Sequence, residues 1–130
     1  MRNRILFSFL AWVAVIFSVQ GKQKDFVLQS GQPVEIACSG SEAPVVHTSL
    51  DLLSRDLQTV LSATAHVDTN TGNIIVGTIG QSKLIEQAGI DISALKNKKQ
   101  AFMLAVSEDG KLVVAGSDSH GTAYGILEIS

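Results

Sequence analysis

The feature that most constrains the fold is the closing segment, residues 112–130, which reads LVVAGSDSHGTAYGILEIS. An apolar strand pattern comes first, a Gly- and Ser-rich turn follows, and the first turns of a helix come next. No Gly or Asn cap, basic last turn or Pro comes after Ile129 and Ser130. We therefore expect the final helix to be incomplete and the chain to be part of a larger polypeptide.

The rest of the sequence mixes short strand patterns with helix patterns. Strands are predicted at residues 25–29, 34–38, 73–77, 101–106 and 112–115. Helices are predicted at residues 49–63 and 82–88 and from Ser119 or Gly121 onward, with a single helical turn at 90–95. The first two strands are expected to pair antiparallel, and residues 108–111 mark a hairpin. The order β-β-α-β-α-β-β-α predicts an α+β fold, a mixed α/β sandwich around a small mixed β-sheet.

The strongest helix pattern lies at residues 49–63. Its apolar residues step by three and four along the chain and so share one face: Leu50, Leu53, Leu57, Val60 and Leu61. Thr48 and Asp51 form an S/T-x-x-D/E start signal, which places the beginning of the helix near Ser49.

Residues 1–21 are expected to be a signal peptide. Arg2 and Arg4 form a basic start, and residues 5–19 are apolar apart from two serines. That stretch is shorter than the roughly 20 residues needed to cross a bilayer, so a cleaved signal fits better than a retained signal-anchor, which stays the alternative. We expect a secreted or periplasmic protein with no stable membrane span after cleavage, whose residues 22–130 form one N-terminal, non-catalytic α/β domain.

The charge of the chain disfavours nucleic acid as a partner. The chain has 10 Lys and Arg residues and 12 Asp and Glu, and two of the arginines lie in the signal peptide. No long basic run exists, because Lys96, Lys98 and Lys99 form only a local cluster on a loop. Cys38 is the only cysteine, so no internal disulfide can form, and its thiol is expected to be a small core group.

A hydrolase site is one interpretation of Ser117, Ser119 and His120, because a strand-to-helix elbow exposes its central side chain. The elbow pattern G-x-S-x-G needs a glycine two residues away on each side of the serine. Ser119 has Gly121 after it but Ser117 before it, and a serine beside a histidine does not easily make the contact with its base. We therefore assign no catalytic residue to the chain.

No cofactor or metal site is predicted either. The turn Gly77-Thr78-Ile79-Gly80-Gln81-Ser82 matches neither G-x-G-x-x-G nor G-x-x-x-x-G-K-[ST]. Its glycines are better explained by a tight turn and close packing. His47, His66 and His120 are too scattered for a metal motif, and the first two are expected on the surface.

Asp118 has two alternative roles. It follows a buried strand and precedes a helix, so its carboxylate can cap the free N–H groups at the helix start. The same position lies at the carboxyl end of a strand, where open α/β sheets bind ligands. Capping is favoured, and contact with a ligand is the alternative.

Three segments together resemble the N-terminal domain of glycoside hydrolase family 115, a family of secreted xylan α-1,2-glucuronidases. They are residues 73–85 (NIIVGTIGQSKLI), 92–98 (ISALKNK) and 115–126 (AGSDSHGTAYGI). The first and last are similar to the family patterns I-I-x-G-T-x-G-x-S and A-G-S-D-x-R-G-T-x-Y-G-I. The resemblance covers most of residues 25–130, and related segments occur in other carbohydrases with similar N-terminal domains.

The resemblance implies a non-catalytic domain that packs against a (β/α)8 barrel, with this chain ending before that barrel. The catalytic carboxylates belong to the barrel, so none is transferred to this chain. Gly121 and Gly125 would let the last helix lie close to the sheet, and Tyr124 would supply a ring for the seam between the domains. Asp118 and His120 are the predicted substrate-binding residues, although His120 replaces a family arginine whose bidentate contact imidazole cannot reproduce.

We thus expect an accessory domain of a secreted glycoside hydrolase that is inactive by itself. Its partners would be the catalytic barrel of the parent chain and, through the barrel, a polysaccharide. A stand-alone secreted binding module is the alternative, although only Phe26, Phe102 and Tyr124 remain as aromatic residues outside the signal peptide. A small hydrolase that uses Ser119 and His120 is the third possibility.

Overall fold

The computed structural model of the chain describes residues 4–6 and 26–130. The predicted signal peptide, residues 1–21, lies outside the described residues except for strand β1 (Arg4–Leu6). In the part of the chain that is described, no helix has the length and apolar character needed to cross a bilayer.

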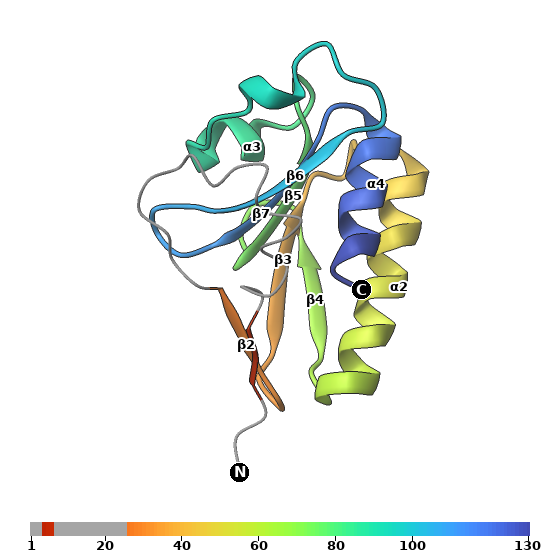
Figure 1. Cartoon of the computed structure of the whole chain (residues 1–130). Helices are drawn as coiled ribbons and strands as arrows, with labels where there is room; N and C mark the ends of the chain where they lie inside the picture. The colour runs from red at the N-terminus through yellow and green to blue at the C-terminus, as the bar shows by residue number, and fades with distance from the viewer. Residues whose placement is uncertain (1–3, 7–25) are drawn as a thin grey trace.

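A five-stranded sheet forms the centre of the domain (Figure 1). In spatial order its strands are β4 (Ala65–Asp68), β3 (Val34–Cys38), β5 (Ile74–Thr78), β7 (Leu112–Gly116) and β6 (Phe102–Val106). Neighbouring strands run parallel except for β6, which pairs antiparallel with β7. The last strand in the sequence therefore lies between two strands that precede it.

Helical elements cover both faces of the sheet, which explains the continuous apolar runs in β5 and β7. On one face, α2 (Pro44–Leu61) and α4 (Ser119–Glu128) lie side by side over the larger core (Figure 1). On the other face, α3 (Lys83–Ala88) and the 3-10 turn η3 (Ser93–Leu95) cover a smaller core. The predicted α+β fold, a mixed α/β sandwich, is confirmed.

Helix α2 begins earlier than its sequence pattern indicates. It starts at Pro44 rather than near Ser49, because proline suits the first helical position. Val46 is 0% exposed, so the extra first turn belongs to the core. The start signal predicted at Thr48 is therefore wrong.

The apolar face predicted for α2 is confirmed at its four leucines, which are all buried: Leu50, Leu53, Leu57 and Leu61. Val60 is 66% exposed, so its predicted place on that face is wrong. Leu57 and Leu61, one turn apart, already occupy the side of the helix that faces the sheet.

Strand β3 is an interior strand and does not form a hairpin with β2 (Val27–Gln29). It pairs parallel with β4 and β5, whereas β2 pairs antiparallel with β1 in a separate ribbon. The antiparallel pairing predicted for residues 25–29 and 34–38 is therefore wrong. Ala37 is 1% exposed, so both faces of β3 are covered. The alternation of Val34, Glu35 and Ile36 had indicated that one face would be exposed to solvent.

No sequence pattern indicates β4, which adds a strand to the predicted order. Its four residues are half-buried or exposed, because it lies at the edge of the sheet beside β3 alone. An edge strand with little buried surface needs no run or alternation of apolar residues, and so it leaves no periodic signal.

The smaller elements agree with the sequence. Ser82 caps α3 by accepting the N–H of Leu84 at 3.3 Å, and Gly89 ends the helix at a φ of 70°. The single helical turn predicted at residues 90–95 is η3.

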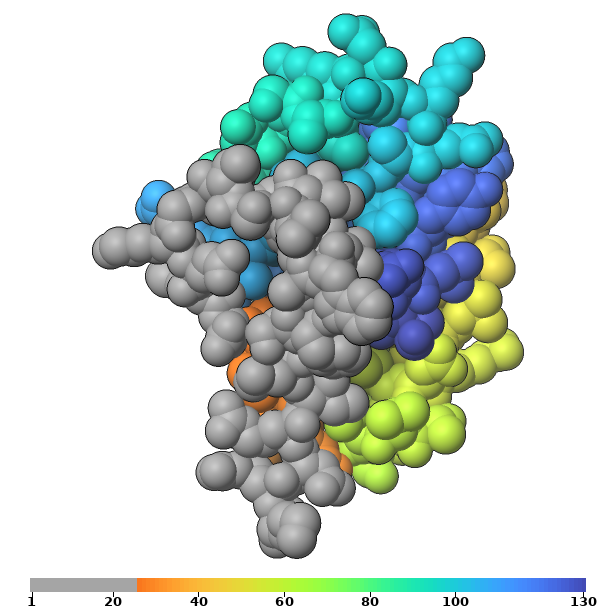
Figure 2. Space-filling model, in the orientation of Figure 1, coloured from red at the N-terminus to blue at the C-terminus, as the bar shows by residue number. Residues whose placement is uncertain are grey.

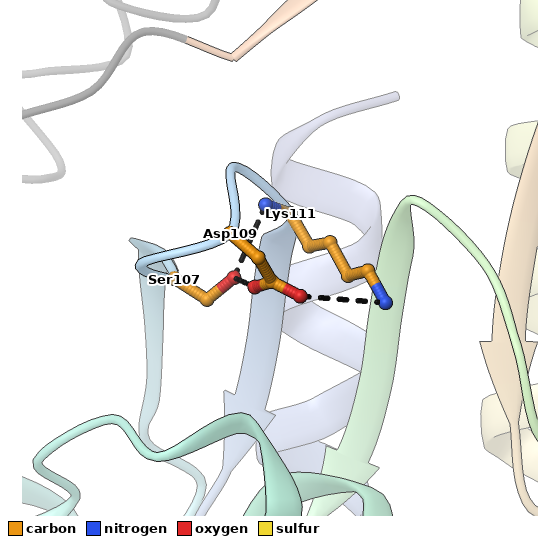
Figure 3. A network of polar contacts seen from close by, with 3 residues as sticks. All are labelled: Ser107, Asp109 and Lys111. Carbon is orange, nitrogen blue, oxygen red and sulfur yellow. Dashed lines mark hydrogen bonds and ion pairs between the residues drawn. The ribbon is translucent and has the colours of Figure 1, made fainter.

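The predicted β6–β7 hairpin is confirmed, and polar contacts fix its turn (Figure 3). The hydroxyl of Ser107 donates to the carboxylate of Asp109 and accepts the backbone N–H of Lys111 at 3.1 Å. Lys111 Nζ lies 3.6 Å from Asp109 Oδ2, and Gly110 has the φ of 84° that the turn requires. This turn lies at the amino end of β7.

Candidate functional site

The carboxyl ends of three parallel strands lie together at one end of the sheet, opposite the β6–β7 turn. β3, β5 and β7 end at Cys38, Thr78 and Gly116, and loops lead from them toward α2, α3 and α4. Open α/β sheets bind ligands at this edge. The predicted substrate-binding residues lie here, with Asp118 in the loop after β7 and His120 in the first turn of α4.

The carboxylate of Asp118 caps α4, as predicted. Its Oδ1 accepts the backbone N–H of Gly121 at 2.8 Å, and its Oδ2 accepts that of Gln100 at 2.9 Å. The hydrogen bond from Gln100 first, then that from Gly121, and the nearby charge of His120 hold the pKa of the Asp118 carboxyl below its ordinary value. Both oxygens are used within the domain, so contact of Asp118 with substrate stays a prediction.

Replacing Asp118 by asparagine is expected to destabilise the domain in a pH-dependent way. Because the folded pKa lies below the unfolded one, the carboxylate stabilises the fold above its unfolded pKa, and this contribution disappears as the pH falls through the folded pKa. Asp118→Asn should therefore have a lower melting temperature than wild type at about pH 7, and the gap should close as the pH falls through the folded pKa of Asp118. The control is Asp56→Asn on the exposed side of α2. A gap that stays constant with pH would refute the assignment.

His120 is exposed at the start of α4. It lowers the pKa of Asp118 through its charge and, after that, through a hydrogen bond from its backbone. This position leaves the imidazole accessible, and its predicted contact with substrate likewise stays a prediction.

The three residues of the hydrolase interpretation do not assemble into a catalytic group. Ser117 Oγ accepts the backbone N–H of Ala101 at 3.0 Å. Ser119 and His120 are the first two residues of α4, where side chains diverge by about 100°. No hydrogen bond joins any two of Ser117, Ser119 and His120 within residues 26–130.

A buried polar cluster, which the sequence analysis missed, links the three loops. Glu42 is 4% exposed, and its carboxylate accepts the backbone N–H of Thr78 at 3.0 Å and the Thr78 hydroxyl at 2.9 Å. The Thr78 hydroxyl also lies 2.7 Å from that of Thr122, which is 0% exposed. We call Glu42, Thr78 and Thr122 the buried network.

The direction of the hydrogen bonds in the buried network follows from its carboxylate. Since Thr78 donates its hydroxyl proton to Glu42, Thr78 can only accept from Thr122. The proton of Thr122 has two further acceptors, the carbonyls of Gly77 at 3.3 Å and Asp118 at 3.1 Å. The buried network is thus satisfied by the domain itself and holds the edge of the sheet together.

The Cys38 thiol lies beside this network at the end of β3. Burial, and after it the negative charge of Glu42, raises the pKa of the Cys38 thiol to about 12. The thiol is therefore protonated at neutral pH and is a poor nucleophile. Its side chain is 1% exposed, which confirms the prediction of a core residue.

The glycines of the turn after β5 serve packing. A Cβ on Gly77 would lie 2.7 Å from Ser82 Cβ, so only glycine allows this approach of strand and helix. Gly80 has a φ of 75°, which the tight turn requires. Among the described residues, no group of three or more His, Cys, Asp and Glu side chains could hold a metal ion.

The last helix lies very close to the sheet and to the chain before β6. A Cβ built on Gly121 would lie 2.1 Å from the carbonyl oxygen of Ala101, and one on Gly125 would lie 2.7 Å from Val114 Cγ1. The close packing predicted for these two glycines is confirmed. Ala101 is thereby held on two sides, because its carbonyl also accepts the N–H of Ser117 at 2.8 Å.

Comparison with known proteins identifies the family of the domain. No family model and no curated protein matches the chain. Among the solved structures that match, one covers 81% of the chain with 97% identity and a TM-score of 0.80; it is described as a novel family GH115 4-O-methyl-alpha-glucuronidase, BtGH115A, with specificity for decorated arabinogalactans. The chain holds a domain of a glycoside hydrolase family 115-like protein. This GH115 domain spans 14% of the length of BtGH115A.

The resemblance inferred from the GTIGQS and AGSDSHGTAYGI segments is thereby confirmed. In the GH115 domain these segments form the end of β5 with the turn after it and the start of α4, which Thr78 and Thr122 of the buried network join.

Proposed function

We propose that this domain is a non-catalytic accessory domain of a secreted glycoside hydrolase. The observation that carries the proposal is its 97% identity to part of a GH115 glucuronidase of which it spans only 14%. The predicted signal peptide supports export. The chemistry would belong to a catalytic barrel elsewhere in the parent polypeptide.

The carboxylates at the sheet edge support a non-catalytic role. Glycosidic cleavage needs two carboxyl groups that face one sugar from opposite sides. Glu42 is buried and bound through both oxygens to Thr78, and both oxygens of Asp118 accept backbone N–H groups. Neither is free to protonate a leaving group or to attack a sugar.

The outer face of α4 is the surface that we assign to the barrel. Tyr124 and Leu127 are 45% and 42% exposed, and their spacing places them on one face of the helix, with exposed His120 one turn before Tyr124. We call these three residues the α4 stripe. An aromatic and an aliphatic side chain together on a helix of this kind are typical of a surface that packs against another domain.

The substrate of the parent enzyme is proposed from the matched protein. BtGH115A is described as a 4-O-methyl-alpha-glucuronidase with specificity for decorated arabinogalactans. We propose that the parent of this domain removes 4-O-methylglucuronic acid branches from such arabinogalactans. Xylan, the substrate implied by the family resemblance, is the second candidate.

The stand-alone binding module remains the alternative function. Modules that bind neutral sugars usually present several exposed rings that stack on the sugar faces. Within residues 26–130, Tyr124 is the only aromatic residue among the large exposed apolar side chains, while Phe26 is buried and Phe102 is half-buried. This composition favours the accessory role.

The first test of the accessory role is enzymatic. The chain alone, incubated with glucuronic-acid-bearing oligosaccharides from arabinogalactan and from xylan, is expected to release no uronic acid above the blank. Full-length BtGH115A is the positive control. Release by the chain alone would overturn the proposal.

The second test of the accessory role concerns the α4 stripe and uses full-length BtGH115A. Lysines at the positions aligned with Tyr124 and Leu127 are expected to lower the melting temperature and the activity, because they place charge in a seam between domains. A lysine at the position aligned with Val60, which is 66% exposed on α2, is the control. Equal behaviour of the two variants would contradict the assignment of the α4 stripe.

A further inference from the structure

A short basic loop lies beside the amino end of α4. It comprises residues 96–100, sequence KNKKQ, and we call it the basic loop. All five of its residues are exposed. The loop lies at the upper end of the molecule in Figure 2, coloured cyan.

Both ends of the basic loop are anchored in the fold. Leu95, directly before it, is 2% exposed in the smaller core. At the other end, Gln100 donates its N–H to Asp118 Oδ2 at 2.9 Å, and Ala101 donates to Ser117 Oγ at 3.0 Å. Asn97 and Gln100 adopt φ values of 62° and 56°, so the loop makes two sharp turns. The lysines are therefore carried on a defined turn.

Two lysines of the basic loop have no ion-pair partner among the described residues. Hydrogen bonds from the backbone and side chain of Ser93, and after them the charge of Lys96, lower the pKa of Asp91, so Lys96 and Asp91 lie close enough to interact. Lys98 and Lys99 form no ion pair with any residue between 26 and 130. The negatively charged carboxylate of Asp118 is tied to the loop through the N–H of Gln100, but it forms no ion pair with Lys98 or Lys99. The loop is thus a local positive site on a chain whose formal net charge is −2.

We propose that the basic loop binds the carboxylates of uronic acid residues on the glycan substrate, through Lys98 and Lys99. The inference rests on the proposed function, which supplies an anionic sugar as the substrate. A lysine ammonium recognises a carboxylate as a point charge, and long-range attraction concentrates an anionic chain near the site.

The position of the basic loop agrees with this role. The hydrogen bond between Asp118 and Gln100 ties the loop to the first turn of α4, which carries His120 of the α4 stripe. If the α4 stripe packs against the barrel, the loop lies at the rim of that interface. From there it would hold a uronic acid branch near the enzyme without entering the catalytic step.

Binding is tested with the whole chain and two versions of one glycan. The probe is a glucuronic-acid-bearing arabinogalactan oligosaccharide, and its matched partner is the same material with the carboxyl groups chemically reduced to alcohols. Calorimetry or affinity electrophoresis should detect binding of the acidic form that weakens about fivefold or more between low and about 0.3 M salt. Equal binding of the reduced form, or no binding of the acidic form, would overturn the proposal.

Charge-reversed variants locate the site. Lys98→Glu/Lys99→Glu should lose binding by about tenfold or more, since repulsion replaces two attractive contacts. Arg55→Glu/Lys111→Glu changes the net charge by the same amount on α2 and at the opposite edge of the sheet, and should keep most of the affinity. Equal losses in the two variants would show that net charge alone is responsible and would refute the assignment to the loop.

These readouts separate the inference from the proposed function. Binding by the basic loop is measured on the chain itself, whereas the accessory role is measured through the activity and melting of full-length BtGH115A. If the chain does not bind the acidic glycan but the α4 stripe variants still behave as expected, only the proposal for the basic loop is refuted. If the chain alone releases uronic acid, the proposed accessory function is refuted, independently of what the basic loop binds.

Discussion

Replacing Gly121 by alanine is expected to lower the free energy of unfolding by about 3 kcal/mol, because the new methyl group has no space. Its carbon would lie 2.1 Å from the carbonyl oxygen of Ala101 and 2.9 Å from the carbonyl carbon, and both are backbone atoms. Relief would require α4 to move away from the chain before β6. That shift would stretch the hydrogen bond from Ser117 N–H to the same carbonyl, now 2.8 Å.

Urea-induced unfolding measures this effect, and Gly40→Ala is the matched control. A Cβ on Gly40 would meet no atom within 4 Å, so this variant should stay within about 0.5 kcal/mol of wild type. Alanine also has a higher helix propensity than glycine, which offsets up to about 1 kcal/mol of the strain at Gly121. A Gly121→Ala variant as stable as Gly40→Ala would show that the close approach of α4 is wrong.

The second large effect is expected at Glu42. Glu42→Ala removes the acceptor of the buried Thr78 N–H, now at 3.0 Å, and leaves that donor without a partner. The expected loss is about 2–4 kcal/mol, because an unpaired buried donor loses the hydration it would have in the unfolded chain. The Thr78 hydroxyl suffers less, because it can turn its proton to Thr122, 2.7 Å away.

Glu42→Gln is the informative companion variant. Its amide oxygen can still accept the Thr78 N–H, and its NH2 group can donate to the Thr78 hydroxyl if that hydroxyl reverses and donates to Thr122. We therefore expect a clearly smaller loss than for alanine, measured by the same urea titration. Equal losses for the two variants would mean that the negative charge, rather than the hydrogen bonds, stabilises this edge of the sheet.

The parts of the fold that could be predicted are those that one segment determines by itself. The β6–β7 hairpin follows from its turn residues, and α3 follows from Ser82 and Gly89 at its ends. The capping role of Asp118 follows because its partner, Gly121, lies three residues away. Local geometry decides each of these, so the sequence pattern is sufficient.

The parts that could not be predicted depend on contacts between distant segments. Thr78 meets Glu42 and Thr122 across 36 and 44 residues, and no local pattern connects them. The partner of β3 is likewise chosen by the tertiary fold, because its alternating sequence suits a hairpin as well as an interior strand. The sequence does contain one usable signal for the buried network. Thr78 and Thr122 are polar residues next to or within patterns that predict buried positions, and a buried hydroxyl needs a hydrogen-bond partner.

The strand order has a consequence for how the chain can acquire its structure. β7 lies between β5 and β6, and α4 brings Ile126 and Ile129 to the larger core. A ribosome releases β5 long before β7, so the edge of β5 stays open and the core unfilled until almost the whole segment has emerged. The sheet and its core should therefore become stable late, in one cooperative step, once β7 and α4 are available.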